Sequence, residues 1–324
     1  MSAAADGSFN SASIAMHQFS RREFAKLAGS ASLVGLAGWV GCTPEQTGPG
    51  GLASDSADSD MLSSLAPLNH RAIQLYSLRD VMPGDPRGVL QQLAEMGYTH
   101  IESYHGPEGI CWGMTPQAFR SYCDGLGLTL LSTHADTGDG LEHDLAEAQE
   151  AGFQYVINPW IGRQETLDDY RAWADRFNVI GSRVREAGLQ FAYHNHDYSF
   201  VAAEDGTLPH DILMAGTDPA LVQMQMDVYW VVVAGQDPIA WINRYPGRFT
   251  SFHIKDRCTA DDGSATSCDL GTGDISFAAL RDALGDAQPA WWIVEQEAYP
   301  NGSSLEAARS NVHYLGNYES DNRT

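Results

Sequence analysis

The chain has 324 residues, of which 43% are hydrophobic, and its 19 Lys and Arg against 42 Asp and Glu give a formal net charge of −23 at pH 7. This length is enough for one large domain or two small ones, each with a buried core. Because a field of this sign repels phosphate groups, the composition argues against a nucleic acid partner and against binding to an anionic membrane surface.

Residues 1–42 have the features of an export signal. Arg21 and Arg22 precede a short stretch of apolar and small residues that ends in Cys42. This pattern predicts a twin-arginine signal, since the apolar part is too short and too rich in glycine to span a membrane well. "WVGC" resembles a lipoprotein processing site in which Cys42 carries the lipid, although Trp39 stands where leucine is usual. We expect an exported protein, either periplasmic or anchored to the membrane through a lipid on Cys42.

Residues 43–67 are rich in Gly, Ser and Asp, which is typical of a flexible linker. From residue 68 to residue 318 apolar runs alternate with amphipathic runs. The periodicity predicts strands at 71–78, 98–104, 128–135, 153–159, 189–196, 221–227, 249–256 and 290–298. It predicts helices at 85–97, 115–127, 140–152, 166–188, 208–216, 237–247, 274–285 and 303–318.

Eight strand–helix units of this kind predict an α/β fold, a (β/α)8 TIM barrel that forms a single domain over residues 68–318. Several strands have few polar residues before their last positions, as expected of strands that are covered on both faces. An open doubly wound sheet is the alternative, but no glycine-rich phosphate loop follows the first strand. "GTGDI" (271–275) comes late, and we interpret it as a turn followed by the helix N-cap Asp274.

Four cysteines remain for the domain if Cys42 takes a lipid. An even number in an exported chain permits disulfides, and Cys258–Cys268 and Cys111–Cys123 would each close a short loop. Buried free thiols are the alternative. No cysteine spacing in the sequence suggests a thiolate zinc site.

Polar side chains collect at the carboxyl ends of the predicted strands, which form the catalytic face of a TIM barrel. They are Glu102, Tyr104, His134, Asn158, His194, His196, Asp227, His253, Lys255, Glu295 and Glu297. Three strands end in two polar residues spaced two apart, so both side chains point to the same face. Polar residues of an ordinary surface would not gather at one end of the strands, and we therefore expect a functional site there.

Two imidazoles and two carboxylates from adjacent strands are ligands that suit a divalent metal ion such as Mn, Zn, Co or Fe, with Mg less favoured. We expect one such ion on His194, Asp227, His253 and Glu295. Their two negative charges match a dication, and coordination positions stay open for substrate or water. The ordinary alternatives are a hydrogen-bonded buried histidine for His194 and a helix N-cap for Asp227.

Four short motifs resemble the xylose isomerase-like (AP endonuclease family 2) barrels, which include sugar isomerases, epimerases and inosose-dehydratase-like enzymes. They are "HNH" (194–196), "MDVYW" (226–230), "HIKD" (253–256) and "VEQE" (294–297), and the resemblance covers residues 72–318. It implies that Asp227, His253 and Glu295 bind the metal. His194 falls where the family usually has glutamate, and a metal-bound imidazole is a poor base, so a symmetric two-glutamate epimerase mechanism is not expected. The resemblance does not extend to the family's DNA-repair enzymes, since Trp230 replaces one of their additional histidines.

The remaining polar residues receive catalytic or substrate-binding roles. We expect proton transfer or electrostatic assistance from Glu102, Lys255 and Glu297, and substrate contacts from His134, His196, Tyr104 and Trp230. The alternatives are an ion pair of Lys255 with Asp256 or Glu297, a salt bridge for Glu102, and simple packing for the aromatic residues. His196 is also the alternative ligand in place of His194.

The expected chemistry is removal of a proton next to a carbonyl group of a sugar or keto-sugar, assisted by the metal ion. This would make the protein an isomerase or epimerase, and a phosphorylated sugar is disfavoured because the site has few cations. A lyase or hydratase that acts on 3-keto-glycosides, on the same scaffold, is one alternative. A carbohydrate-binding lipoprotein without turnover is another. The sequence leaves open which metal, which sugar and which oligomeric state the protein has.

Overall fold

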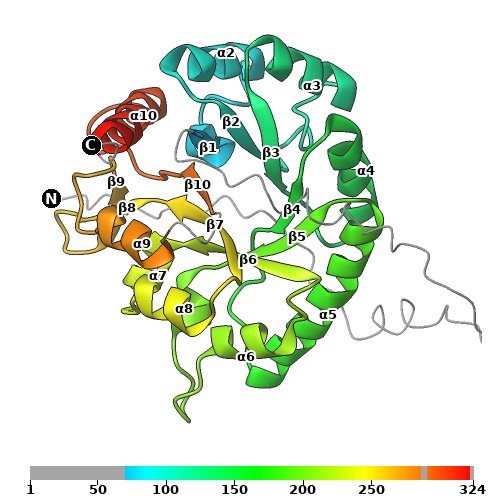
Figure 1. Ribbon diagram of the computed structural model, residues 1–324, viewed down its shortest axis with the longest axis vertical. Coiled ribbons are helices and arrows are strands. Elements are labelled where there is room, and N and C mark those ends of the chain that lie inside the picture. The colour runs from blue at the N-terminus through cyan, green and yellow to red at the C-terminus, as the bar shows by residue number, and fades with distance from the viewer. Residues whose placement is uncertain (1–69, 286–289, 322–324) are drawn as a thin grey trace, which may run out of the picture. The chain divides into compact units, whose positions relative to one another are not determined.

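The computed structural model describes residues 70–285 and 290–321 (Figure 1). A closed barrel of parallel strands lies at its centre, in the order β1-β10-β7-β6-β5-β4-β3-β2. The predicted TIM barrel is confirmed. The expected export signal (1–42) and linker (43–67) lie outside the described residues.

The barrel strands are short, and nearly every residue in them is buried because helices cover the outside of the sheet. They are β1 (Ala72–Gln74), β2 (His100–Tyr104), β3 (Thr129–His134), β4 (Tyr155–Asn158), β5 (Gln190–His194), β6 (Val222–Asp227), β7 (Phe249–Ile254) and β10 (Trp291–Val294). The parallel register places Asp227 directly opposite His253. This register brings the polar strand ends to one level of the barrel.

Helices surround the barrel, as the outer ring in Figure 1 shows. They are α2 (Pro86–Met96), α3 (Pro116–Gly125), α4 (Leu141–Ala151), α5 (Leu167–Glu186), α6 (Pro209–Gly216), α8 (Pro238–Arg244), α9 (Phe277–Leu284) and α10 (Ser304–Asp321). Their apolar faces and the outer faces of the strands form one continuous core. None of the helices in the described ranges combines the length and the apolar character needed to cross a membrane.

Inside the barrel, apolar side chains lie below the polar ones. Ala72, Leu131 and Ile293 form a small cluster that is separate from the main core. On their strands they come a few residues before the polar side chains at the carboxyl ends. The cluster therefore closes the barrel beneath the functional end.

Two predicted strands end earlier than expected and continue as short helices. The strand predicted at 71–78 stops at Gln74, whose side chain accepts a hydrogen bond from the Tyr76 amide and caps the 3-10 helix η1 (Leu75–Leu78). The strand predicted at 189–196 stops at His194, and His196 instead precedes the 3-10 helix η2 (Asp197–Phe200). His194 and His196 are therefore not neighbours on one strand face.

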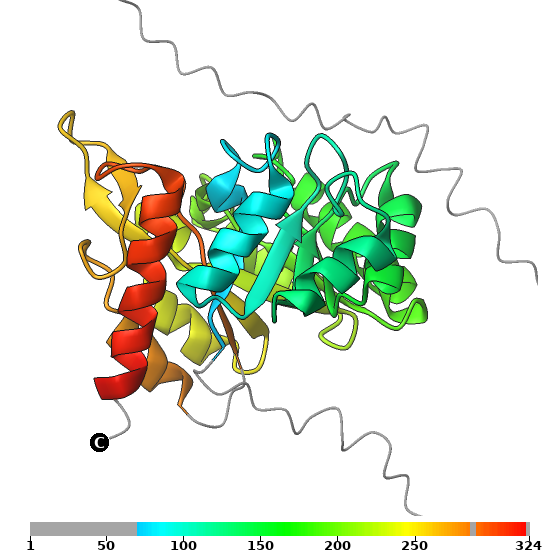
Figure 2. The ribbon, with the colours of Figure 1, turned by 90° about the horizontal axis from the view of Figure 1, so that it is seen from above.

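Two further elements were not expected. The apolar run after Asp227 forms helix α7 (Val228–Val233), which Asp227 caps. The strand predicted at 249–256 ends at Ile254 and is followed by a hairpin of β8 (Asp256–Thr259) and β9 (Ala265–Cys268). Figure 2 shows this hairpin projecting beyond the barrel on the same side as η1.

A disulfide between Cys258 and Cys268 joins the two strands of the hairpin, as predicted. For Cys111 and Cys123 the alternative of buried free thiols holds, because both are unpaired thiols in the main core. The predicted N-cap Asp274 was wrong. Ser276 caps α9, and Asp274 accepts a hydrogen bond from the guanidinium of Arg257 at 3.0 Å.

Candidate functional site

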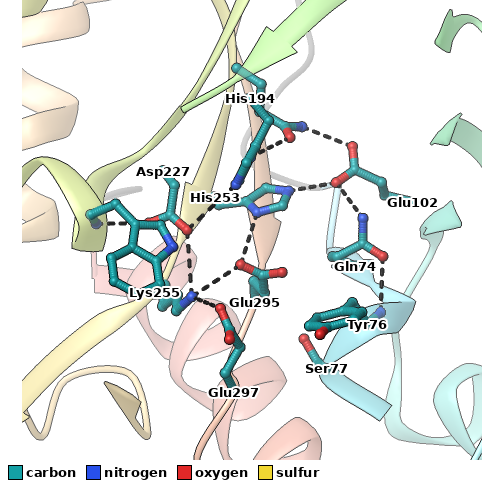
Figure 3. Close-up of polar contacts among 12 residues, drawn as sticks. Gln74, Tyr76, Ser77, Glu102, His194, Asp227, His253, Lys255, Glu295 and Glu297 are labelled. Atoms are coloured by element: carbon teal, nitrogen blue, oxygen red, sulfur yellow. Dashed lines mark hydrogen bonds and ion pairs between the residues drawn. The ribbon is translucent and has the colours of Figure 1, made fainter. Parts of the chain in front are cut away.

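Side chains from four neighbouring strands converge at the carboxyl end of the barrel (Figure 3). His194 and Asp227 are the last residues of β5 and β6, His253 lies in β7, and Glu295 follows β10. All four are buried, and each offers a ligand atom within 4.8 Å of the others. The structure thus brings together the residues that were predicted to bind a metal ion.

The two carboxylate oxygens of Asp227 have different surroundings. Oδ1 accepts a hydrogen bond from the Trp230 amide at 3.2 Å and caps α7. Oδ2 is buried and receives no hydrogen bond from any described residue; it lies 3.9 Å from Nε2 of His194 and 3.6 Å from Nζ of Lys255. Burial raises the pKa of Asp227. A buried carboxylate oxygen without a donor, next to an imidazole nitrogen, fits a bound cation.

Asn195, the central residue of "HNH", fixes the position of Asp227. Its Oδ1 accepts a hydrogen bond from the Asp227 amide at 3.1 Å, and its Nδ2 donates to the Asp227 carbonyl at 3.2 Å. These two bonds join the ends of β5 and β6. Asn195 is itself 1% exposed, so Asp227 has little freedom to move.

His253 lies between two carboxylates, as Figure 3 shows. Its Nδ1 is 3.1 Å from Oε2 of Glu295, and its Nε2 is 2.5 Å from Oε1 of Glu102. Burial disfavours the charged ring, but Glu295 and Glu102 outweigh it and raise the pKa of His253 to about 10. If Nδ1 holds a cation, Nε2–H still donates to Glu102, an arrangement that orients metal-bound histidines in many proteins.

Glu102 is completely buried. Its Oε1 accepts from Nε2 of Gln74 at 2.8 Å and contacts His253. Its Oε2 accepts from Oγ of Ser132 at 2.5 Å and from Nε2 of Gln225 at 2.8 Å. A carboxylate with both oxygens occupied in this way orients its neighbours and is poorly placed to accept a proton from a substrate.

His134 belongs to the same buried layer. Its Nε2 lies 2.8 Å from Oε1 of Gln225 and 3.2 Å from Oε1 of Glu102. Its ring stacks on His253 with the centroids 5.3 Å apart. This nitrogen therefore points into the barrel, toward Gln225 and Glu102.

Lys255 is 1% exposed and is surrounded by carboxylates. Its Nζ forms an ion pair with Oε1 of Glu297 and lies 3.3 Å from Oε2 of Glu295 and 3.6 Å from Oδ2 of Asp227. Burial opposes its charge, but these carboxylates raise the pKa of Lys255 well above its usual value. Lys255 is therefore an ammonium ion, suited to stabilise negative charge and unsuited to accept a proton.

His196 and three aromatic rings line one side of the site. The His196 ring lies 4.4 Å from the ring of Trp160, 5.8 Å from that of Tyr198 and 5.4 Å from that of Trp230. Nζ of Lys255 lies 4.9 Å from the centre of the Trp230 ring. Trp160 is 43% exposed, so it offers a flat apolar surface at the rim of the site.

Tyr104 packs between two aromatic rings. Its ring makes edge contacts with Tyr76 at 5.2 Å and with Trp112 at 4.9 Å, and only 8% of it is exposed. Trp112 is buried and donates to Oγ of Ser103 at 3.2 Å. Tyr76 is less buried than its two neighbours and is the ring of this group that is open to a ligand.

Sequence reasoning missed the polar layer beneath the candidate ligands, which consists of Gln74, Ser132 and Gln225. Ser132 and Gln225 each come two residues before a strand-end residue, His134 and Asp227. Since side chains two apart in a strand share a face, the patterns "SxH" and "QxD" could have revealed them. Gln74 gives no comparable signal. It is the last residue of its strand, so no polar residue follows it two positions later on the same strand face.

Comparison with known proteins shows the family to which the chain belongs. Residues 90–318 match the family model described as xylose isomerase-like TIM barrel. The chain is 30% identical to inosose dehydratase of Lacticaseibacillus casei over 146 residues, which cover 44% of this chain and 48% of that protein. It is 31% identical to inosose dehydratase of Clostridium tetani over 170 residues, or 46% of this chain and 55% of that protein. The chain thus spans about half the length of the curated relatives it matches.

The fold also matches solved structures over most of its length. A sugar phosphate isomerase/epimerase from Parabacteroides distasonis superposes with a TM-score of 0.65 at 25% identity, covering 78% of this chain and 95% of that one. An L-ribulose 3-epimerase superposes with a TM-score of 0.59 at 15% identity and shows the same fold.

Proposed function

We propose, since the chain belongs to the xylose isomerase-like TIM barrel family, that it is a metal-dependent enzyme of sugar chemistry. Its proposed reaction removes a proton from the carbon next to a carbonyl group of an unphosphorylated sugar or keto-sugar. One observation carries this proposal. Oδ2 of Asp227 is buried without a hydrogen bond from any described residue, within reach of the ligand atoms of His194, His253 and Glu295.

These four residues would hold one divalent ion, with Mn, Zn, Co or Fe favoured by the mixture of imidazole and carboxylate ligands. When bound, such an ion polarises a carbonyl oxygen and stabilises the negative charge that forms when the neighbouring carbon loses its proton. The buried carboxylates of Asp227 and Glu295 have lost most of their hydration, and a bound cation would compensate for that loss.

Glu297 is the proposed base. Its side chain is 32% exposed, so a substrate in the barrel opening could reach it. The ammonium group of Lys255 beside it stabilises negative charge on a substrate oxygen. In this scheme Glu102, expected from the sequence to be a base, orients His253.

The charges around the site support a neutral substrate. Lys255 is surrounded by carboxylates. Arg79 donates from Nη2 to the Glu297 carbonyl at 2.7 Å and from Nη1 to Oη of Tyr299 at 3.0 Å. A phosphate group would have to draw these cations away from existing partners, whereas a sugar ring can stack on Trp160.

A β-elimination is the second candidate, including lyase action on 3-keto-glycosides. The relatives named inosose dehydratase favour it, because a dehydration of this type also begins with loss of a proton next to a carbonyl. His194 also favours it, since epimerisation by two carboxylate bases lacks one of them here. Elimination needs one base, and Glu297 can take the proton and pass it to the leaving group, while the adjacent ammonium group of Lys255 stabilises the negative charge that develops.

Incubation with sugars in deuterated water tests the proposal. The metal-loaded protein is mixed with free ketoses, aldoses and 3-keto-glycosides, and the products are followed by NMR. Deuterium at the carbon next to the carbonyl indicates isomerisation or epimerisation, while an unsaturated ketone absorbing in the ultraviolet indicates elimination. Sugar binding without exchange in any substrate would contradict the enzyme proposal and indicate a carbohydrate-binding protein.

Export remains part of the proposal. The Arg21–Arg22 pair supports a twin-arginine signal, and the Cys258–Cys268 disulfide supports an oxidising compartment. Mass spectrometry of the mature N-terminus tests the proposed export. The protein is expressed in a bacterial host that has both twin-arginine export and lipoprotein processing. A lipid-modified Cys42 supports the lipoprotein, a free N-terminus after cleavage supports a periplasmic protein, and an intact residue 1 contradicts export.

A further inference from the structure

Gln225 is a completely buried residue of β6 that contacts a carboxylate and two imidazoles. Its Nε2 donates to Oε2 of Glu102 at 2.8 Å. Its Oε1 lies 2.9 Å from Nδ1 of His194 and 2.8 Å from Nε2 of His134. One amide group thus connects the candidate ligand His194 to the buried layer around Glu102.

The partners of this amide determine which way it faces. A carboxylate oxygen only accepts hydrogen bonds, so the amide nitrogen must face Glu102 and the amide oxygen must face the two rings. An amide oxygen also only accepts. Each ring nitrogen that contacts it must therefore carry the hydrogen: Nδ1 of His194 and Nε2 of His134.

This assignment decides which nitrogen of His194 is free. A neutral imidazole carries one hydrogen, so with Nδ1 occupied the lone pair is on Nε2. Nε2 is the nitrogen that lies 3.9 Å from Oδ2 of Asp227. The other tautomer would place two lone pairs against each other, 2.9 Å apart, between Nδ1 and the amide oxygen.

We propose that Gln225 is a positioning residue that makes His194 a metal ligand by holding it in the tautomer with hydrogen on Nδ1. This inference rests on the proposed function and deepens it. Glutamate, usual in the family at the position of His194, needs no such partner because either carboxylate oxygen can bind a cation. Imidazole needs one, and Gln225 supplies it.

The same amide oxygen helps to decide between two possible ligand sets. His134, His194 and His253 also lie close enough together to share an ion. However, Nε2 of His134 carries a hydrogen that faces Gln225 and Glu102, so this nitrogen has no lone pair for a cation. Nε2 of His194, which Gln225 leaves free, lies next to the buried Oδ2 of Asp227, so the set with Asp227 and Glu295 is the one that Gln225 supports.

The test is the tautomer of His194 in the full-length, metal-free protein. Two-bond proton–nitrogen NMR spectra of 15N-histidine-labelled protein distinguish the two tautomers, and the His194→Gln variant identifies the His194 ring. Gln225→Met removes both hydrogen-bonding groups at similar size. Gln223→Met is the matched control, because Gln223 lies on the same strand but donates to the Pro219 carbonyl at 2.8 Å.

We expect hydrogen on Nδ1 of His194 in the wild type and in Gln223→Met, and a shift toward hydrogen on Nε2 in Gln225→Met. Calorimetric titration with Mn²⁺ or Zn²⁺ should then show about a 10- to 100-fold weaker affinity in Gln225→Met, the usual loss when a supporting residue is removed. Hydrogen on Nε2 in the wild type would overturn the inference, even if Gln225→Met does not fold. An unchanged tautomer or an unchanged affinity in Gln225→Met would overturn it as well.

Failure of the proposed function would give a different result. A wild-type protein that has hydrogen on Nδ1 but binds neither metal would refute the metal site, and with it the role of Gln225 as support for a ligand. A wild-type protein that binds metal while His194 carries hydrogen on Nε2 would leave the proposed function intact and refute only the role of Gln225.

Discussion

Nζ of Lys255 lies 3.6 Å from Oδ2 of Asp227 without forming a hydrogen bond to it. The ammonium group instead pairs with Glu297 and lies 3.3 Å from Oε2 of Glu295. One lysine therefore shares its charge among three carboxylates, two of them buried. This arrangement leaves negative charge at Asp227 and Glu295 for a metal ion to balance. Loss of either the Lys255 ammonium group or the metal ion should therefore destabilise the site.

Asp227→Asn should abolish metal binding while the protein stays folded. Asparagine is as good a helix N-cap as aspartate, so the hydrogen bond that the Trp230 amide donates to Oδ1 is kept. The substitution removes the charge at Oδ2, and we expect a loss of metal affinity of more than about 100-fold. Elemental mass spectrometry of the purified variant and its thermal melting curve measure the two effects.

Asp227→Ala is the control for the cap. It should lose the metal equally and also lose about 1 kcal/mol of stability, because the first turn of α7 loses its acceptor. Wild-type metal content in Asp227→Asn would contradict the ligand role of Asp227.

Lys255→Met should destabilise the protein strongly, and a metal ion should restore part of the loss. Removing one partner of a buried ion pair typically costs about 3–5 kcal/mol, because the other charge stays buried without compensation. With Mn²⁺ bound at Asp227 and Glu295, the ion would balance part of that charge. Denaturant titrations of the variant with a chelator and with excess Mn²⁺ measure the difference.

Arg257→Met is the matched control for this experiment. Arg257 pairs with Asp274, and both side chains are partly exposed, so its loss should cost less than about 1 kcal/mol whether or not metal is present. Equal destabilisation of Lys255→Met with chelator and with Mn²⁺ would show that Lys255 and Mn²⁺ do not interact with the same carboxylates.

The barrel and the candidate ligands could be predicted from the sequence because both depend on local patterns. His194, Asp227, His253 and Glu295 stand at the ends of apolar runs, and strand ends of a TIM barrel meet at one face. Gln225 could not be recognised in the same way. Its partner Glu102 is 123 positions away in the sequence, and only closure of the barrel brings β2 within reach of β6.

The errors in secondary structure have a related cause. "VYWVVV" (228–233) is rich in residues that favour strands, yet it forms α7 because Asp227 caps it and the surrounding core buries it. "LYSL" (75–78) is equally apolar and forms η1 once the Gln74 side chain accepts from the Tyr76 amide. A short apolar run does not distinguish a buried strand from a buried helix, so tertiary contacts decide.

Ser267→Ala should lower turnover without lowering metal content. Oγ of Ser267, on β9, accepts hydrogen bonds from the amides of Glu297 at 3.0 Å and Ala298 at 2.8 Å. The variant leaves both amides without this acceptor, which should cost about 1–3 kcal/mol of stability. Glu297, the proposed base, should then be held less firmly in position. Hydrogen exchange at these two amides, measured beside the rate of substrate deuteration, tests the connection.

Ser276→Ala is the matched control, since Ser276 caps α9 through the Ala279 amide at 3.3 Å and should affect stability alone. Faster exchange at Glu297 with an unchanged reaction rate would argue against Glu297 as the base. Reduction of the Cys258–Cys268 disulfide should act in the same direction as Ser267→Ala, because it frees the hairpin that carries Ser267.

His210→Phe should make the protein more resistant to acid. His210 is buried against Phe200 and Trp241, with ring centroids 4.4 Å and 5.1 Å away, and burial lowers its pKa to about 3 from about 6.5 in the unfolded chain. Between these two pH values the unfolded chain binds a proton at His210 that the folded chain does not, so the free energy of unfolding falls as the pH falls. His210 lowers the free energy of unfolding by about 1.4 kcal/mol for each unit of decrease in pH within this range. Urea titrations from pH 4 to pH 6 should therefore show a slope smaller by about one proton in His210→Phe than in the wild type. Equal slopes in His210→Phe and wild type would show that His210 is not buried as a neutral ring.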